Sequence, residues 1–407
     1  MTSSYHLEDR GKCNKNACAN ARNVPKLRFK GYNYEWKHYR LKDITTRITR
    51  KNKKLESDRP LTISAIDGLI DQKDYFNRQI ASKDMSGYYL LKNGEFAYNK
   101  SYSNGFPYGS IKRLNKYDKG ALSTLYICFS LQNICSDFLE KYFETDKWYK
   151  EIYMIAVEGA RNHGLLNISV EDFFNTMHKF PNIEEQEKIA SFLTLIDKKI
   201  EKQKELVELL KKYKKGLLSA IFSQKLRFKD DNGNDYPAWE EKYIQEVCSI
   251  TTGKGNTQDK EENGIYPFYV RSPIVEKSNK YIFDGEAVLT VGDGVGTGKV
   301  FHYVNGKFNF HQRVYKMSNF SGINGRYFYY YFSTHFYDRV KRMTAKTSVD
   351  SVRMDMIAKM PIFIPTNEEQ DKIINLLTNV ENIFLKNEES LFLLQEYKKG
   401  LLQQLFI

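Results

Sequence analysis

One long stretch occurs twice in this chain, and it constrains the fold more than any other feature. Residues 181–222 read PNIEEQEKIASFLTLIDKKIEKQKELVELLKKYKKGLLSAIF, and residues 365–406 read PTNEEQDKIINLLTNVENIFLKNEESLFLLQEYKKGLLQQLF. The two copies align without a gap, from the proline and the shared Glu-Glu-Gln to the shared Tyr-Lys-Lys-Gly-Leu-Leu. A repeat of this length indicates a duplicated structural unit.

Each copy is predicted to form one long helix. Thr366 with Glu369 three residues later is a capping box after a proline, and Asn182 with Glu185 is its close equivalent. Apolar residues then follow the alternating spacing of three and four residues that is typical of a coiled-coil seam. The seam residues are Ile189, Leu193, Ile196, Ile200, Val207, Leu210, Leu217 and Ile221 in the first copy and Ile373, Leu377, Val380, Phe384, Leu391, Leu394, Leu401 and Leu405 in the second.

Polar residues interrupt both seams at matching places. Gln203 and Lys214 break the first seam where Asn387 and Lys398 break the second. A polar residue in a seam is a recognised means of fixing the register of two paired helices. The matching interruptions therefore favour pairing in one defined register.

Two long helices in one chain are expected to pair with each other. At about 1.5 Å per residue, some 40 residues form a rod of roughly 60 Å, and its apolar stripe needs a partner. The segment between the copies is long enough to return the chain for an antiparallel start, so we expect an intramolecular antiparallel coiled coil. The alternative is two separate amphipathic helices, each lying on its own domain. Gly216 and Gly400 should each cost about 1 kcal/mol in a helix, which suggests either close backbone approach or a C-terminal cap.

The duplication extends to the segments before the helices. Residues 26–29 (KLRF), followed by Trp36, have a counterpart in residues 225–228 (KLRF), followed by Trp239. The expected fold class is α+β, with two globular lobes alternating with the two long helices in a pseudo-two-fold arrangement. The expected boundaries are a flexible leader at 1–23, a first lobe at 24–180, a helix at 181–222, a second lobe at 223–364 and a helix at 365–407.

Length, cysteine usage and hydropathy bound the class of protein. A chain of 407 residues is long enough for two or three domains with their own cores. It contains no apolar run of the ~18 residues that span a membrane, and its N-terminus lacks the apolar region of a signal peptide. Five cysteines form neither an even disulfide framework nor a paired zinc motif. We expect a cytoplasmic protein with reduced thiols.

Positive charge is concentrated in the lobes. Residues 1–180 carry 30 Lys and Arg against 20 Asp and Glu, out of a net charge of +13 for the whole chain. A basic lobe suggests a polyanionic partner, and nucleic acid is the commonest one in the cytoplasm. The alternative is that this charge only keeps the protein soluble.

The first lobe contains a loop with the residue types that contact DNA. Residues 94–98 are predicted to form a turn followed by a strand, and residues 122–143 are predicted to be helical. Between them, residues 99–113 are rich in Gly, Asn, Ser and Tyr and end in Lys112-Arg113. Lysine and arginine neutralise phosphates, whereas Asn, Ser and Tyr bind sugars and base edges. A second basic run at residues 47–54 is either a phosphate contact or a solvated loop.

The second lobe is predicted to be richer in strands. Residues 300–304 and 307–311 flank Asn305-Gly306, which predicts a β-hairpin with its turn at that pair. Residues 281–283 and 287–291 suggest another strand pair around Asp284-Gly285, and residues 325–342 are predicted to be a helix.

The motifs of the common nucleotide, metal and hydrolase sites do not occur in the sequence. Residues 292–299 (GDGVGTGK) resemble a phosphate-binding loop, but a Walker A motif needs Gly where Asp293 stands and Ser or Thr where Val300 stands. The seven histidines show no metal-ligand spacing. We expect a strand-to-strand loop there, no catalytic residues, no metal site and no cofactor, and hence a binding module.

The doubled helices, the repeated KLRF segments, the GDGVGTGK stretch and residues 311–315 (HQRVY) together resemble the specificity (S) subunit of type I restriction-modification systems. The resemblance covers the chain after about residue 24. It implies a non-catalytic, sequence-specific DNA-binding subunit in which each lobe is a target recognition domain for one half of a bipartite, asymmetric double-stranded target. It also implies that the helices pair as a spacer and dock two modification (methyltransferase) subunits, and that restriction (translocase and nuclease) subunits join the full complex. S-adenosylmethionine, ATP and Mg are then expected only in those partner subunits.

The residues expected to contact DNA combine positive charge with amide, hydroxyl and imidazole groups. They are Lys100, Tyr102, Asn104, Lys112 and Arg113 in the first lobe and Lys254, Arg271, Lys299, His311, Arg313, Lys346 and Thr347 in the second. Each of them is alternatively a surface charge. The competing functions are a coiled-coil scaffold without DNA affinity and a DNA-modifying enzyme with an unrecognised site.

Overall fold

The computed structural model describes residues 23–407 except 77–80, 83, 157–165, 295 and 344–350. The chain forms two compact units. The first contains residues up to Lys202 together with Leu391–Ile407, and the second contains Gln203–Ser390. Each unit therefore combines one lobe with a part of each long helix.

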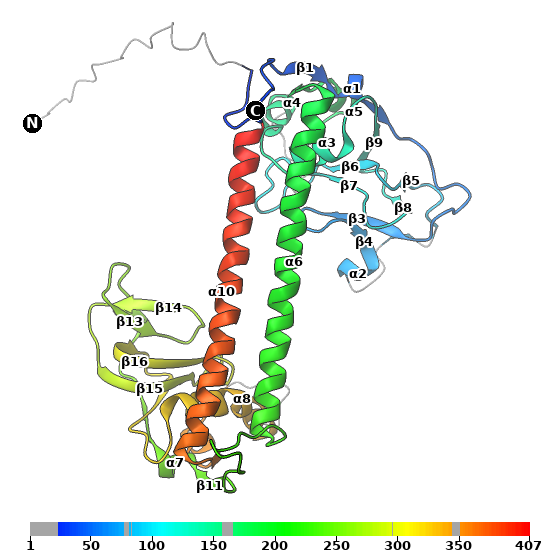
Figure 1. The fold of residues 1–407 in the computed structure, drawn as a ribbon. Helices are drawn as coiled ribbons and strands as arrows, with labels where there is room; N and C mark the ends of the chain where they lie inside the picture. Colours follow the sequence, from blue (N-terminus) through cyan, green and yellow to red (C-terminus); the bar gives the residue numbers. More distant parts are fainter. Residues whose placement is uncertain (1–22, 77–80, 83, 157–165, 295, 344–350) are drawn as a thin grey trace, which may run out of the picture. The chain divides into compact units, whose positions relative to one another are not determined.

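The two long helices are α6 (Ile183–Phe222) and α10 (Asn367–Leu405) (Figure 1). Glu185 N and Glu369 N donate to the side chains of Asn182 and Thr366, as expected for helix caps. The Glu side chains do not complete the predicted capping boxes. They bind arginines of the preceding lobes instead.

In each unit the parts of α6 and α10 lie antiparallel and share a core. The first unit buries Ile189 and Leu193 of α6 in one cluster with Leu401 and Leu405 of α10. The second unit buries α6 residues in one cluster with α10 residues in the same way, and these residues are Leu217, Ile221, Ile373, Leu377 and Val380. Of the other seam residues, Ile200 and Val207 are buried, and Ile196, Leu210, Phe384, Leu391 and Leu394 are half-buried.

In each unit the polar seam residues have polar partners on the other long helix. In the second unit, Gln203 Nε2 donates to Asn387 Oδ1 at 2.9 Å, and Lys214 Nζ lies 2.6 Å from Glu381 Oε1. In the first unit, Lys398 Nζ lies 2.6 Å from Asp197 Oδ1. The polar breaks are thus paired across the helices, which fixes the register because a shift would leave them without partners.

The lobe of the first unit is built on three sheets, with strand orders β1-β10, β2-β9-β6-β7 and β4-β3-β8-β5. Pairing is antiparallel except between β3 and β8. The strands are β1 (Lys37–Arg40), β2 (Thr45–Arg47), β3 (Pro60–Ser64), β4 (Gly68–Asp71), β5 (Tyr89–Lys92), β6 (Phe96–Asn99), β7 (Ser110–Arg113), β8 (Lys119–Leu122), β9 (Ile127–Leu131) and β10 (Met177–Phe180). The helices are α1 (Leu41–Ile44), α2 (Gln72–Phe76), α3 (Ser136–Phe143), α4 (Tyr149–Ile155) and α5 (Val170–Asn175).

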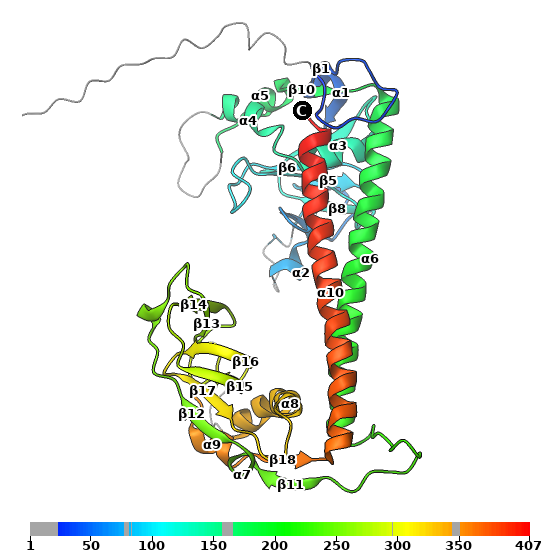
Figure 2. The same ribbon diagram turned by 60° about the vertical axis from the view of Figure 1, so that its left-hand side comes forward.

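The lobe of the second unit has a two-stranded sheet, β11-β18, and a six-stranded sheet of order β12-β17-β15-β16-β13-β14. Helix α8 lies against β15 and β16 of the large sheet (Figure 2). The strands are β11 (Glu240–Tyr243), β12 (Ser249–Thr252), β13 (Tyr266–Tyr269), β14 (Val275–Ser278), β15 (Phe283–Val291), β16 (Phe301–Phe310), β17 (Val314–Ser318) and β18 (Pro361–Ile364). The helices are α7 (Ile244–Val247), η1 (Thr257–Asp259), α8 (Gly325–Met343) and α9 (Met354–Ala358).

Two local predictions are confirmed. Gly94, with a φ of +83°, precedes strand β6, as the turn-and-strand pattern indicated. The helix predicted over residues 325–342 is α8.

The prediction of one helix over residues 122–143 is wrong. Only α3 is helical, and β9 occupies the middle of that segment. Ile127, Cys128 and Phe129 of β9 pair with β6 and are almost fully buried, so the sheet overrides the helical periodicity.

Both hairpin turns predicted in the second lobe are also wrong. Asn305-Gly306 lies inside the continuous strand β16, and Asp284-Gly285 lies inside β15, where Gly285 pairs with Gly306. The φ values of Gly285 and Gly306 are +141° and +127°. The two glycines therefore allow a local distortion within the paired strands and do not form turns. The connection between β15 and β16 is the glycine-rich segment 292–300, as a strand-to-strand loop.

For Gly216 and Gly400, the predicted C-terminal cap is wrong, and so is close backbone approach among the described residues of this chain. Both glycines lie inside helices that continue to Phe222 and Leu405, so neither is a C-terminal cap. A Cβ atom added to either glycine would meet nothing within 4 Å among the described residues, so the lobes and paired helices do not require glycine there.

Candidate nucleic-acid interface

The glycine-rich loop of the second lobe is packed onto the two segments that carry Arg271 and Arg313. Gly292 N donates to Arg313 O at 2.7 Å, and a Cβ atom at Gly292 would lie 2.9 Å from that oxygen. A Cβ atom at Gly296 would lie 3.1 Å from Arg271 O. The lack of a side chain at these positions therefore allows close backbone approach, most tightly at Gly292.

Asp293 stands between the two arginines. Its Oδ1 lies 3.7 Å from Arg271 Nη1, and its Oδ2 lies 3.5 Å from Arg313 Nε. The side chains of Arg271 and Arg313 are 51% and 63% exposed, whereas that of Asp293 is 27% exposed. One carboxylate thus holds two guanidinium groups that face solvent.

His311 is buried beside this cluster. Its Nδ1 accepts a hydrogen bond from Arg313 N at 3.0 Å, so the neutral ring carries its hydrogen on Nε2. Burial lowers the pKa of His311, and the positive charges of Arg271 and Arg313 act in the same direction. The ring is therefore neutral at neutral pH.

Lys254 belongs to the same end of the lobe. Gly255 N donates to Phe310 O, and Gln312 N donates to Gly255 O at 2.9 Å, so the segment around exposed Lys254 runs beside His311. The structure thus brings Lys254, Arg271, His311 and Arg313 together.

The remaining residues predicted to bind DNA in the second lobe are not part of that cluster. Lys299 is exposed, and its Nζ lies 5.0 Å from the ring centroid of Tyr337 on α8, a cation–π contact. Lys346 and Thr347 lie outside the described residues.

Two of the residues predicted to bind DNA in the first lobe face solvent. Tyr102 is 61% exposed, and Asn104 is also exposed, in the segment that joins β6 to β7. Both line a cavity of about 340 Å³ together with Ile66, which is 84% exposed. Lys100 is bound within the lobe, because its Nζ donates to Ile168 O at 3.1 Å.

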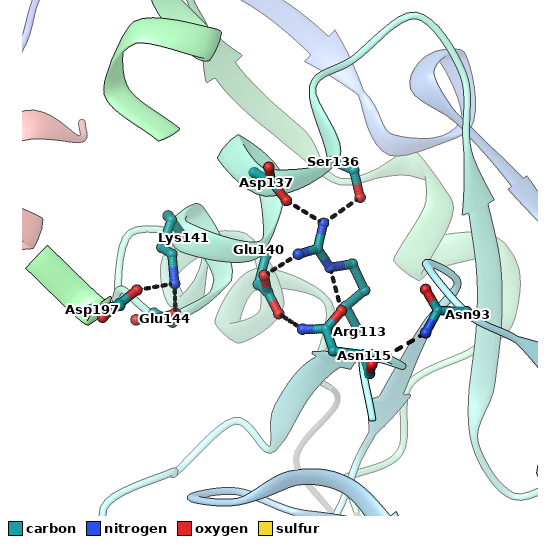
Figure 3. Close-up of polar contacts among 9 residues, drawn as sticks. All are labelled: Asn93, Arg113, Asn115, Ser136, Asp137, Glu140, Lys141, Glu144 and Asp197. Atoms are coloured by element: carbon teal, nitrogen blue, oxygen red, sulfur yellow. Dashed lines mark hydrogen bonds and ion pairs between the residues drawn. The ribbon is translucent and has the colours of Figure 1, made fainter. Parts of the chain in front are cut away.

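Arg113 forms a polar network inside the first lobe (Figure 3). Its guanidinium group lies 2.6 Å from both Asp137 Oδ1 and Glu140 Oε2, and its Nε donates to Asn115 Oδ1 at 2.7 Å. The side chain is 15% exposed. These charge-assisted contacts connect β7 to the start of α3 and occupy the donors that a base would need.

Lys112 is half-buried beside the same network. Burial lowers its pKa, while the carboxylates of Glu140 and Glu144 act in the opposite direction. Its Nζ lies 6.0 Å from the ring of Phe106. The ammonium group therefore faces the acidic residues of its own lobe.

The basic run at residues 47–54 is also partly used inside the lobe. Arg50 Nη2 binds Glu95 Oε2 at 2.7 Å, and Lys51 Nζ donates to Gly87 O at 2.9 Å. Because Arg50 and Lys51 are bound within the lobe, fewer basic side chains of residues 47–54 can contact phosphates.

Sequence reasoning missed Asp293, because it treated this residue only as a departure from a nucleotide-binding motif. It also missed Arg28 and Arg227 of the repeated KLRF segments. Arg28 binds Glu185 through Nε and Nη2, both at 2.8 Å, and Arg227 binds Glu369 in the same bidentate manner at 3.1 and 2.7 Å. The sequence could have indicated these pairs, because both the arginine of the KLRF segment and the glutamate at the start of the long helix occur in each copy of the repeat.

The long helices carry a second duplicated feature on their exposed surface. Leu209 and Tyr213 of α6 are 63% and 54% exposed, and Leu393 and Tyr397 of α10 are 57% and 55% exposed. In each helix these residues precede the unobstructed glycine at a spacing of four and three residues, which places all three on one face. We call these faces the α6 stripe and the α10 stripe.

Among the residues that the structure describes, no helix combines the length and the hydropathy of a membrane span. In the same residues, no three His, Cys, Asp or Glu side chains gather as the ligands of a metal ion would.

Residues 237–391 match the family described as "Type I restriction modification DNA specificity domain". The specificity subunit of the type I restriction enzyme EcoDI from Escherichia coli is 25% identical over 171 residues, which cover 40% of this chain and 37% of that subunit. The MjaVIII specificity subunit from Methanocaldococcus jannaschii is 23% identical over 301 residues, which cover 67% of this chain and 70% of that subunit.

Solved structures share the fold over nearly the whole chain. The type I restriction-modification S subunit from M. genitalium superposes with a TM-score of 0.61 at 15% identity, covering 94% of this chain and 99% of that one. A chain from a study of complex assembly and conformational transition in a type I R-M system gives a TM-score of 0.55 at 16% identity, covering 91% and 97%. Residues 237–391 thus match the family's DNA specificity domain, and the chain is similar to the specificity subunits of type I restriction-modification systems.

Proposed function

We propose that this chain is the DNA-recognition subunit of a type I restriction-modification complex in the cytoplasm. Each lobe reads one half of a bipartite, asymmetric double-stranded target, and the paired helices set the spacing between the halves. Two modification subunits dock on the helices, and restriction subunits join the full complex. Methyl transfer and cleavage, with S-adenosylmethionine, ATP and Mg, belong to those partners.

The observation that carries this proposal is a duplicated frame that supports two different lobes. Both units anchor a lobe to a long helix through the same arginine and glutamate pair, Arg28 with Glu185 and Arg227 with Glu369. Beyond these shared contacts, the sheets of the two lobes differ in number and in strand order. Two unlike readers on one repeated frame suit a split target whose halves differ in sequence, whereas two identical readers suit a palindrome.

The exposed chemistry of the lobes supports DNA as the ligand. Arg271 and Arg313 present guanidinium groups, which bind guanine edges bidentately, and Lys254 supplies a cation for phosphate. In the first lobe, Tyr102 and Asn104 offer a hydroxyl and an amide for sugars and base edges. We therefore assign DNA contact to these residues and a structural role to Lys100 and Arg113.

Exchange of one lobe tests the division of the target. Replacing residues 223–364 with the corresponding lobe of another specificity subunit should change one half of the methylated sequence and leave the other half intact. The readout is genome-wide mapping of modified bases in cells that carry the complete system. A change in both halves would contradict modular recognition. Absence of salt-sensitive DNA binding by the wild-type protein, even with the modification subunit present, would favour a scaffold instead.

Deletion of a heptad from both helices tests the spacer. Residues 202–208 and 386–392 are matching segments of the repeat, and removing both preserves the seam spacing. Seven helical residues span about 10 Å, which corresponds to about three base pairs at 3.4 Å each. The gap between the half-sites should shorten by about that amount with both half-sites retained, and an unchanged gap would refute the proposal.

The α6 and α10 stripes support the docking of two partner copies. Each presents an exposed leucine and tyrosine beside a glycine that costs about 1 kcal/mol in a helix and that the described residues do not require. Close approach of a partner at the glycine accounts for that cost. Because the stripes are duplicated, one chain offers the same surface twice.

Charge substitutions in the stripes test this assignment. Tyr213→Glu or Tyr397→Glu alone should reduce the number of bound modification subunits from two to one, and the double variant should bind none. Native mass spectrometry of the purified complex gives the count. Lys215→Glu and Lys399→Glu are matched controls, since these exposed residues also repeat, and they should retain two subunits.

A further inference from the structure

Asp293 is held in an unusual way for a carboxylate between two arginines. Its Oδ1 is buried and has no hydrogen-bond partner among the described residues. The ion pairs of Asp293, at 3.7 Å from Oδ1 to Arg271 Nη1 and 3.5 Å from Oδ2 to Arg313 Nε, are too long for hydrogen bonds. A buried carboxylate oxygen without a hydrogen bond is costly, so a residue that retains one invites a functional explanation.

The backbone around Asp293 is fixed on both sides. Asp293 forms an isolated antiparallel bridge with Ser351, and Val352 N donates to Gly292 O at 2.7 Å. Tyr315 Oη donates to Val352 O at 3.1 Å. The carboxylate is therefore mounted on a braced loop, whereas the two guanidinium groups that it attracts are more than half exposed.

Negative charge at this place has two opposite effects on DNA binding. It restrains Arg271 and Arg313, which lowers the conformational freedom that they lose when they contact a base. It also repels phosphates, so it weakens the sequence-independent attraction of the same arginines for the DNA backbone. Both effects favour discrimination between base pairs over total affinity.

We infer that Asp293 is a specificity-determining residue, which positions Arg271 and Arg313 for guanine edges in the major groove and opposes their use as general phosphate contacts. This inference rests on the proposed function. Guanine offers the O6 and N7 acceptors that match a guanidinium fork, so the half-site of the second lobe should contain guanine at two positions.

Selection from a randomised duplex library tests the assignment. The wild-type complex with its modification subunits should enrich guanine at two positions of the second half-site. Arg271→Lys and Arg313→Lys should each lose guanine preference at one of these positions, because lysine lacks the bidentate fork. Absence of guanine from that half-site would overturn the inference.

Asp293→Asn separates positioning from a merely structural role. Discrimination against substituted guanine positions, measured with synthetic duplexes, should fall about 10-fold. Affinity for unrelated duplex DNA should rise, and the salt slope of that binding should steepen by about 1 because one more phosphate is contacted. A general loosening of the lobe would lower both kinds of binding, and that result would contradict the inference.

A matched control changes the same charge elsewhere in the lobe. Asp284 is exposed at the opposite end of β15, so Asp284→Asn should leave guanine discrimination unchanged. Equal loss of discrimination in both variants would count against Asp293. Failure of the wild-type complex to bind any sequence selectively would refute the proposed function, whereas selective binding that Asp293→Asn leaves unchanged would refute only this inference.

Discussion

The two units repeat their frame in atomic detail but differ in the lobes that the frame carries. In both units a glutamine of the long helix donates to the preceding proline carbonyl and accepts a backbone N–H from the lobe: Gln186 from Cys135, and Gln370 from Asn324. The first lobe then builds two four-stranded sheets, and the second builds one sheet of six strands. The attachment points are thus fixed while the surface beyond them is free to diverge.

The repeated attachment is not equally satisfied in the two units. Trp239 Nε1 donates to Glu369 Oε2 at 3.0 Å, whereas Trp36 Nε1, at the matching place before β1, is buried without a partner among the described residues. Trp36 packs instead on Phe138 and Phe406. A tryptophan at the matching position therefore donates a hydrogen bond to the long helix in the second unit and packs against aromatic rings in the first.

The largest effect is expected from a substitution that removes the contacts of Glu369 with Arg227 and Trp239. Glu369→Ala should destabilise the second unit by about 2–4 kcal/mol, because Arg227 Nε and Trp239 Nε1 lose their acceptor, while Arg227 Nη2 keeps the carbonyl oxygens of Tyr236 and Pro237. Glu185→Ala should cost the first unit about 1 kcal/mol less, since Glu185 receives no indole hydrogen bond. Amide hydrogen exchange at increasing denaturant concentration measures the free energy of unfolding of each unit separately.

The control for that comparison is a double change. Glu369→Met with Arg227→Met should be more stable than Glu369→Ala alone, because no unpaired charge remains. Equal destabilisation of the two units by the single substitutions would show that the indole contact does not distinguish them.

An intermediate effect concerns acid sensitivity. Burial lowers the pKa of His178 in the first unit to about 3, and the matching residue of the repeat in the second unit is Ile362. Between that value and the ordinary pKa of about 6.5, the unfolded chain binds a proton that the folded chain does not. Stability should therefore fall as the pH falls below about 6.5, by about 2 kcal/mol down to pH 5.

His178→Ile should make the first unit behave like the second by removing this contribution. Urea unfolding of the first unit between pH 7.5 and 5 should show a smaller loss of stability in the variant than in the wild type. Identical pH dependence in both proteins would mean that His178 is protonated in the folded state near its ordinary pKa.

The smallest expected effect is the same in both units. Gly216→Ala and Gly400→Ala should each stabilise the isolated chain by about 0.4–1 kcal/mol, since an added Cβ meets open space and lowers the entropy of the unfolded chain. Thermal unfolding of the single variants measures the gain. A loss of stability in only one variant would reveal an environment that the repeat does not share.

The elements that could be predicted from the sequence are those that depend on local periodicity and on the repeat. The long helices, their polar interruptions and the helix α8 could be predicted because spacing along one chain specifies which face is apolar. The resemblance to the specificity subunits also rested on the repeated residues. The gathering of Arg271, His311 and Arg313 was anticipated only as a set of residue types, without their common location.

The other features became known only from the folded chain, because they depend on contacts between residues far apart in the sequence. Pairing with β6 made a strand of residues 127–131, and pairing of Gly285 with Gly306 turned two apparent hairpin turns into strand interiors. Arg113 was predicted to face DNA, yet carboxylates of α3 bind it inside the lobe. Asp293 became a candidate for function because folding placed it between two arginines from separate segments, and no local pattern specifies such a meeting.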